Sequence, residues 1–501
     1  MAVGNIYLIA AISIIGGGLF GFDISSMSAI IGTKQYKCYF DQSGDGSCTG
    51  PKASVQGGIT ASMAGGSWLG ALISGLLSDH LGRKKAIMTG AVIWYSNTNI
   101  QDFFCPVAHF QPRCIGSIIV CASQNIAMLI IGRVINGLSV GICSAQVPVY
   151  ISELAPPSKR GRLVGAQQWA ITWGIMIMFY ISVSHPIPSN SNLSTLTILQ
   201  YGCSFLKGSR AFRIPWGLQM IPAIILFCGM IFLPESPRWL GRKDRWDDAR
   251  NVLVLVHGKG NPDAPFVITE LKQIRDQIEF ERNNADVTYL ELFKPNMINQ
   301  THIGVFTQIW SQLTGMNVMM YYITYVFTMA GLTGSTLLVS SSIQYVINVV
   351  MTVPALLYVD RWGRRPTLLI GAALMAIWLF TNAGLLGSYG HYAGPKGVDN
   401  TPAASTKITG PPSKAVIACS YLFVASFAPT WGPVSWIYPP ELYPLRVRGK
   451  AVALSTSANW AFNFALGYFV PPAFVSIRWR TYIGESGPFF PSLFQSLPLI
   501  P

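Results

Sequence analysis

The sequence predicts an all-α membrane protein built from two related bundles of six helices, and three observations lead to this fold class. The 501 residues are 50% hydrophobic and only 11% charged, whereas soluble domains carry about 25% charged residues. Long apolar runs recur from one end of the chain to the other. Charged motifs that follow two of the early runs return, in the same order, in the second half.

The apolar runs have the length of membrane spans. A helix crosses the hydrocarbon core of a bilayer, about 30 Å thick, with roughly 20 apolar residues, and most of the runs reach that length. They cover residues 6–22, 57–77, 126–151, 163–183, 214–233, 303–329, 337–359, 367–387, 414–438 and 450–475. A cleaved signal peptide is the alternative for the first run, but this run is too long and too rich in glycine, and no cleavage site follows it.

The net charge of +14 is explained by topology rather than by a nucleic-acid partner. Basic residues gather in short connections after even-numbered spans, at 83–85, 159–162, 238–245, 361–365 and 446–450. By the positive-inside rule, these connections and the N-terminus are expected to be cytoplasmic.

Two charged motifs indicate an internal repeat. The repeated residues are Asp79, Arg83, Glu153 and Arg160 in the first half and Asp360, Arg364, Glu441 and Arg448 in the second. Such a duplication predicts two pseudo-symmetric six-helix bundles around a site near the bilayer midplane. We expect an N-terminal bundle over residues 1–234, a cytoplasmic helical linker over 235–300 and a C-terminal bundle over 301–483.

Cysteines and catalytic motifs give no sign of a metal, a cofactor or an enzyme. The nine cysteines lack the spacing of metal ligands. No nucleophile–base pair or phosphate loop is found. Cys38 and Cys48 share the first outward loop, where they either pair or remain free thiols.

Further motifs carry a resemblance to a known family. They are GGLFGFD at 17–23, GRV at 132–134, PVYISELAP at 148–156, PESPRWL at 234–240 and QLTGMN at 312–317. Together they resemble the sugar porter family of the major facilitator superfamily, and within it the fungal high-affinity monosaccharide/proton symporters. The resemblance implies the fold of that superfamily, alternating access, and uptake of a hexose such as glucose with protons across the plasma membrane by a monomer.

The chain departs from the family pattern in three places. Residues 95–114 interrupt the third span, residues 183–200 lengthen the loop after the fifth, and residues 484–501 stand where the family has its twelfth span. Val183–Ser184 and residues 484–486 can both be encoded across a splice-donor-like hexamer. We therefore hypothesise retained introns and expect an interrupted third helix and a missing twelfth. We expect the sequence as given to fold poorly or to transport nothing, and its correctly spliced parent to transport.

One ionisable pair is predicted inside the spans. An ionised carboxylate in a span is costly unless it is paired or faces water, so Asp23 is a functional candidate. The resemblance implies that Asp23 carries the proton and that Arg133 is its partner. The alternative is a buried pair with a purely structural role.

Amides and aromatic rings within spans are the expected sugar ligands, because sugars present both hydroxyl groups and an apolar face. The resemblance places sugar contacts at Gln168, Gln312, Asn317, Asn348, Trp436 and Asn459. A lone amide in a span more often joins two helices. The resemblance also assigns Tyr321 and Tyr322 to an outer gate, with plain aromatic packing as the alternative. Ser311 and Ala428 depart from the family, which leaves the preferred sugar open.

The eight repeated charged residues are expected to form a latch at the cytoplasmic ends of the spans. Ion pairs would form across the bundle interface in the outward-facing state and break when the protein opens inward. The alternative is that these charges only fix topology, although lysine and arginine do so without acidic partners.

The expected partners are a monosaccharide, protons and the lipid bilayer. The alternative functions are a facilitative carrier of hexose, pentose, polyol or quinate, and a transporter-like sugar sensor. Such sensors have long cytoplasmic C-terminal tails, which this chain, ending at Pro501, does not show.

Overall fold

The computed structural model describes residues 4–482 apart from residues 32, 43–47, 49, 96–116, 184–207, 259, 283–287, 395–396, 399–400, 402 and 445. The predicted inserts at 95–114 and 183–200 lie outside the described residues, except for Tyr95 and Val183, and the predicted tail at 484–501 lies outside them entirely. The interrupted third helix and the missing twelfth helix therefore stay predictions.

The first half of the chain is a bundle of long helices. Its elements are α1 (Ile6–Ser13), α2 (Ile15–Ile31), α3 (Lys34–Tyr39), α4 (Ala53–Leu81), α5 (Arg83–Tyr95), α7 (Ser117–Cys121), α8 (Ile126–Leu154), η1 (Pro157–Lys159), α9 (Arg160–Val183), α10 (Arg210–Leu218) and α11 (Met220–Ile231). Glycines let α4 and α8 approach closely. A Cβ on Gly66 would lie 2.0 Å from the carbonyl oxygen of Val134, and one on Gly137 would lie 2.1 Å from that of Met63.

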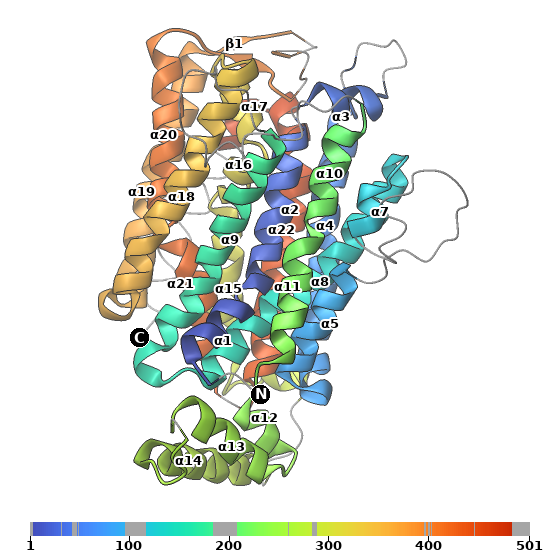
Figure 1. Cartoon of the computed structure of the whole chain (residues 1–501). Coiled ribbons are helices and arrows are strands. Elements are labelled where there is room, and N and C mark those ends of the chain that lie inside the picture. The colour runs from blue at the N-terminus through green and yellow to red at the C-terminus, as the bar shows by residue number, and fades with distance from the viewer. Residues whose placement is uncertain are drawn as a thin grey trace, which may run out of the picture.

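Three short helices follow: α12 (Pro237–Arg242), α13 (Trp246–Val256) and α14 (Pro265–Arg282). They form a cap beyond one end of the bundle, which we call the linker end (Figure 1). The cap has its own small core, in which Leu253 of α13 packs against Val267, Ile274 and Ile278 of α14. The predicted helical linker is thus a packed layer rather than an extended connection.

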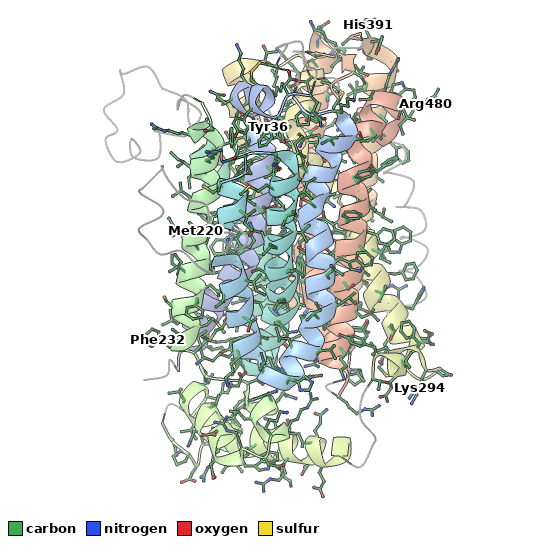
Figure 2. The ribbon with its side chains drawn as sticks, turned by 90° about the vertical axis from the view of Figure 1, so that its right-hand side faces the viewer. Tyr36, Met220, Phe232, Lys294, His391 and Arg480 are labelled. Atoms are coloured by element: carbon green, nitrogen blue, oxygen red, sulfur yellow. A yellow bond between two sulfur atoms is a disulfide. The ribbon has the colours of Figure 1, made fainter. Side chains whose placement is uncertain are left out.

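The second half forms the other bundle. Its elements are η4 (Tyr289–Phe293), α15 (Ile298–Leu313), α16 (Met316–Tyr321), α17 (Ile323–Met329), α18 (Gly334–Trp362), α19 (Arg364–Tyr389), β1 (His391–Tyr392), β2 (Thr406–Lys407), α20 (Pro411–Phe427), α21 (Trp431–Leu442) and α22 (Arg448–Ser476). Strands β1 and β2 pair antiparallel. Together with α3 they mark the opposite end of the molecule, the hairpin end, where Figure 2 labels Tyr36 and His391.

Seven helical segments of the described residues are long and apolar enough to cross a membrane. They are Ile6–Ile31, Ala53–Leu81, Ile126–Leu154, Arg210–Ile231, Thr336–Trp362, Arg364–Tyr389 and Pro411–Leu442. Helix α9 of the first bundle and helix α22 of the second run alongside these segments, although they are less apolar (Figure 1). They lie at the centre, where α22 packs on α4 and α9 packs on α2 and α18.

The apolar run at 303–329 is not one helix. It breaks after Leu313, where Gly315 has φ +82°, and again at Tyr322. A left-handed φ favours glycine because a Cβ would clash there. Broken helices of this kind line binding sites in membrane transporters.

Candidate functional site

A small cavity lies between the two bundles, and all six predicted sugar contacts line it. Its wall includes Gln168, Gln312, Asn317, Asn348, Trp436 and Asn459, together with apolar residues such as Phe20, Ile24 and Phe427. The cavity measures about 50 Å³, whereas sites for small molecules span about 300–1,000 Å³. In this conformation the site is contracted and has to widen before it admits a sugar-sized ligand.

The polar side chains of the site bond to one another. The indole nitrogen of Trp436 donates to Oε1 of Gln168 at 3.0 Å, which joins α21 of one bundle to α9 of the other. The amide of Asn317 donates to Oε1 of Gln312 at 2.7 Å, across the break between α15 and α16. A hydroxyl-rich ligand would replace these internal bonds with its own.

Two further buried amides, Asn463 and Gln308, complete this network, and sequence reasoning did not identify them. Asn463 donates to Oε1 of Gln312 at 3.1 Å, and Asn459 donates to Oε1 of Gln308 at 2.6 Å. Helical spacing could have identified both residues, because Asn463 lies one turn after Asn459 and Gln308 lies one turn before Gln312.

Two buried oxygens near the cavity lack a hydrogen-bond partner among the described residues. They are Oδ1 of Asn348 and the hydroxyl of Tyr321. Leaving such a group unpaired costs about 1–3 kcal/mol. Both oxygens can therefore gain from a ligand that brings hydroxyl groups.

Asp23 and Arg133 form a fully buried ion pair. The guanidinium donates twice, from Nη2 to Oδ2 at 2.9 Å and from Nη1 to Oδ1 at 3.3 Å. Its Nε donates to the carbonyl oxygen of Ile59 at 2.9 Å, so the pair connects α2, α8 and α4. Asp23 lies directly beside the cavity-lining Ile24 on α2. Each charge compensates the other in the protein interior, so the loss of one leaves the other buried and unpaired.

Tyr321 and Tyr322 follow the helix break at Gly315, on its hairpin-end side, and both are buried. The hydroxyl of Tyr322 donates to the carbonyl oxygen of Gly467 on α22 at 2.8 Å, and its ring stacks on Tyr325 with 5.7 Å between centroids. Both tyrosines directly follow the cavity-lining Met320, and their role as an outer gate stays a prediction.

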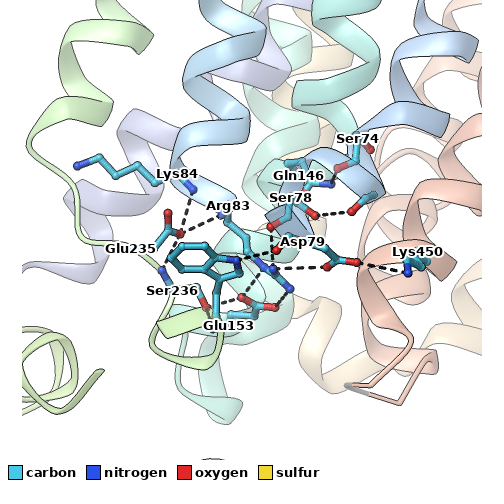
Figure 3. A network of polar contacts seen from close by, with 12 residues as sticks. Ser74, Ser78, Asp79, Arg83, Lys84, Gln146, Glu153, Glu235, Ser236 and Lys450 are labelled. Carbon is cyan, nitrogen blue, oxygen red and sulfur yellow. Dashed lines mark hydrogen bonds and ion pairs between the residues drawn. The ribbon is translucent and has the colours of Figure 1, made fainter. Parts of the chain in front are cut away.

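At the linker end, the first copy of the charged motif forms a closed network (Figure 3). Arg83 donates to both carboxylate oxygens of Glu153 at 3.1 and 3.2 Å and lies 3.8 Å from Asp79. Ser236 also donates to Glu153. Oε1 of Glu235 accepts three backbone N–H groups, those of Arg83, Lys84 and Ser236, at 2.9–3.1 Å.

The second copy repeats the clamp in the other bundle. Arg364 donates to both oxygens of Glu441 at 2.9 and 3.0 Å and to Asp360 at 3.2 Å. The start of α9 lies against this clamp, because a Cβ on Gly161 would lie 2.0 Å from Oδ1 of Asp360. Each clamp thus joins helices within one bundle, while the opposite bundle approaches it closely.

Arg160 and Arg448 form no ion pair with the carboxylates of the described residues. Arg448 is buried and donates to the carbonyl oxygen of Tyr443 at 3.2 and 3.3 Å. The reason is that Arg83 and Arg364 already occupy the oxygens of the two glutamates. The predicted latch therefore contains two clamped arginines, Arg448 on a backbone carbonyl oxygen, and Arg160, whose Nε has no hydrogen-bond partner among the described residues.

Contacts link the two halves of the chain at both ends of the molecule. At the hairpin end, Cys38 and Cys48 form a disulfide, which decides between the two alternatives for these thiols. In the same loop, Lys37 donates to Oγ1 of Thr401 in the other half at 2.9 Å. At the linker end, Lys450 of α22 lies 3.8 Å from Asp79 of α4. The two bundles are therefore in contact at both the hairpin end and the linker end.

Comparison with known proteins decides the family. The family model described as sugar (and other) transporter matches residues 9–489. The chain belongs to this family. It is a multi-pass sugar transporter of the major facilitator superfamily and not an enzyme.

Three relatives illustrate the match. The chain is 46% identical to a high-affinity glucose transporter of Kluyveromyces lactis, over 96% of this chain and 80% of that one. It is 44% identical to a glucose transporter of Aspergillus flavus, over 96% and 84%. A solved proton:xylose symporter bound to 6-bromo-6-deoxy-D-glucose has the same fold, with a TM-score of 0.74, 23% identity and coverage of 99% and 96%.

Within this sugar transporter, the described residues hold no cluster of histidine, cysteine, aspartate and glutamate that fits a metal ion. The chemistry available at the site is hydrogen bonding by amides and stacking on Trp436 and Phe20, with the buried ion pair of Asp23 and Arg133 on the adjoining helices. These are the means of binding and moving a neutral polyhydroxyl compound.

Proposed function

We propose that the protein imports a hexose, with glucose as its substrate, together with a proton. One observation carries the proposal: the buried ion pair of Asp23 and Arg133 lies on α2 and α8, and the residue after Asp23, Ile24, lines a cavity walled by amides and aromatic rings. Two relatives that share more than two fifths of their residues with this chain are named glucose transporters, which supports glucose among the hexoses.

The proposed coupling depends on the free-energy cost of leaving the buried Arg133 without the carboxylate of Asp23. While Asp23 is ionised, it holds Arg133 through two hydrogen bonds and ties α2 to α8. Protonation of Asp23 removes its charge and weakens that tie, so the two helices can shift around a bound sugar. When the proton leaves on the other side, the pair forms again and resets the carrier.

The proposed transport cycle alternates between the two closed ends. Sugar enters from the hairpin end after Tyr321 and Tyr322 move, and it replaces the internal bonds of Gln168, Gln312 and Asn317. Release at the linker end requires the parting of the bundles near Asp79 and Lys450. The basic residues that gather at the linker end support a cytoplasmic location for that end.

Uptake in a host that lacks its own hexose carriers tests the proposal. Cells that express the chain with residues 95–114 and 183–200 deleted and a family-like twelfth span restored should accumulate radiolabelled glucose above its outside concentration, and a protonophore should abolish the accumulation. Uptake that only equilibrates and ignores the protonophore would contradict proton coupling. Stronger competition by unlabelled xylose, a polyol or quinate than by glucose would contradict the assigned substrate.

The sugar contacts make a separate prediction. Gln168→Ala and Asn317→Ala each leave a sugar hydroxyl without a partner, at a cost of about 1–3 kcal/mol. The half-saturation concentration for glucose should therefore rise about tenfold in either variant. Ser413→Ala on α20, outside the residues that line the cavity, is the matched control and should leave it unchanged. Unchanged kinetics in both site variants would place the sugar elsewhere.

A further inference from the structure

A second, larger cavity lies at the linker end, away from the sugar site. It measures about 380 Å³ and is open to the outside. Its walls come from the start of α5, from the segment that leaves α11, and from the cap helices α12 and α13. The lining residues are Lys84, Lys85, Leu233, Pro234, Glu235, Trp239, Leu240, Arg245, Asp248, Asn251, Val252 and Leu255.

The charged groups of this cavity leave an excess of positive charge. Both of its acidic residues are already engaged, because Glu235 accepts three backbone N–H groups and Asp248 pairs with Arg245 at 2.6 Å. Lys84 and Lys85 form no ion pair with a carboxylate in the part of the chain that the structure describes. The cavity is therefore lined by three basic and two acidic side chains, which leaves an excess of one positive charge beside the two lysine ammonium groups.

The two lysines are placed to receive an anion rather than to serve the latch. In Figure 3 the side chain of Lys84 points away from the pair of Arg83 and Glu153. Its ammonium group donates to the carbonyl oxygen of Ile231, the last residue of α11, at 2.8 Å. Two of its three donor positions are thus left for another acceptor. Lys85 is exposed.

The remaining wall of the cavity is apolar and adjoins the membrane-facing surface. Trp239, Leu240 and Val252 form a small hydrophobic cluster behind it. Ile231 and Phe232, at the end of the adjoining membrane helix, expose 49% and 56% of their surfaces (Figure 2 labels Phe232). An occupant of this cavity therefore meets positive charge, an apolar wall and the edge of the bilayer together.

We propose that this cavity binds the headgroup of an anionic phospholipid, with a phosphate held by Lys84 and Lys85 and the acyl chains lying along Ile231 and Phe232. Basic pockets beside membrane helices bind such headgroups, and the cavity volume falls within the usual range for small ligands. A bound headgroup joins α5 to α12 and α13. Since α5 begins with the clamped Arg83, the lipid stabilises the closed linker end.

Lipid retention by the purified full-length protein tests this inference. The protein is placed in nanodiscs of phosphatidylcholine with or without phosphatidylinositol phosphate, and retained lipid is counted by native mass spectrometry. The double variant Lys84→Gln/Lys85→Gln should retain about tenfold less phosphatidylinositol phosphate than the wild type. The control Lys272→Gln/Lys294→Gln, which removes two exposed lysines outside the cavity, should retain as much as the wild type.

A second variant keeps both lysines. Asn251→Trp narrows the mouth of the cavity and should lower retention to a similar degree, whereas Asn251→Ala should not. Equal retention by the lysine variant and its control would overturn the proposal, as would equal retention of phosphatidylcholine. Equally tight binding of inorganic phosphate would show a site for free phosphate and would overturn the lipid assignment.

Discussion

The two copies of the charged clamp have nearly the same geometry but very different surroundings. Arg83 and Glu153 lie 3.1 Å apart, and Arg364 and Glu441 lie 2.9 Å apart. The side chains of the first pair are 3% and 5% exposed, whereas those of the second are 17% and 28% exposed. The two copies of the motif therefore make the same contacts, but their ion pairs differ in burial and hence in their expected contribution to stability.

The difference comes from what covers each clamp. In the first copy, the segment after α11 folds back, so that Glu235 caps the start of α5, Ser236 donates to Glu153, and the indole of Trp239 donates to the carbonyl oxygen of Asp79 at 3.2 Å. Among the described residues, no segment does this for Arg364. We infer that the first clamp is a permanent anchor and the second the weaker one that yields first.

The largest expected effect concerns the two glutamates. Glu153→Gln removes the carboxylate that holds the buried Arg83 through two hydrogen bonds, leaving only the longer pair with Asp79 at 3.8 Å, and should cost about 3–5 kcal/mol of folding free energy. Glu441→Gln leaves Arg364 partly exposed and still paired with Asp360 at 3.2 Å, and should cost about 1 kcal/mol or less. Thermal unfolding of the purified variants measures both. Equal losses, or a larger loss in Glu441→Gln, would break the comparison.

The next effect concerns Glu235, which accepts backbone hydrogen bonds beside the first clamp and has no counterpart among the described residues at the second. Glu235→Ala leaves the backbone N–H groups of Arg83, Lys84 and Ser236 without their acceptor, at a cost of about 1–3 kcal/mol. Glu235→Gln keeps an acceptor oxygen and should lose less. Thermal unfolding of both variants beside the wild type gives the ranking, and a smaller loss in the alanine variant would contradict the capping role.

The smallest effect is a pH dependence. Burial raises the pKa of Glu235 above its ordinary value of 4.5, although backbone hydrogen bonds from Ser236 and Lys84 and the nearby Arg83 oppose the shift. Between the ordinary pKa of 4.5 and the raised pKa of Glu235 in the folded protein, the folded protein binds more protons than the unfolded one. Stability therefore falls as pH rises through this range. Relative to Glu235→Gln, the wild type should lose stability as pH increases upward from 4.5. A gain over that range would contradict this sign.

Sequence reasoning found the fold and the family, because hydropathy, repeated charges and long motifs are local signals. It also selected the cavity wall, since all six residues transferred by the resemblance line one cavity. The break at Gly315 escaped it, because three short helices in a row are as apolar as one long helix.

Interactions between distant helices could not be read from the chain. Spacing alone does not show that Arg83 and Arg364 would occupy both glutamates and leave Arg160 and Arg448 without a carboxylate. Nor does it show that Asn463 meets Gln312 across the site. Such pairings depend on how helices rotate against one another.

The proton role of Asp23 is the central claim, and the variant Asp23→Asn tests it most directly. The amide keeps the volume of the side chain but cannot ionise. In cells that lack other hexose carriers, radiolabelled glucose is followed in two modes, as uphill accumulation and as exchange against preloaded unlabelled glucose. We expect the variant to lose accumulation and keep exchange. Undiminished uphill accumulation in Asp23→Asn would contradict the account.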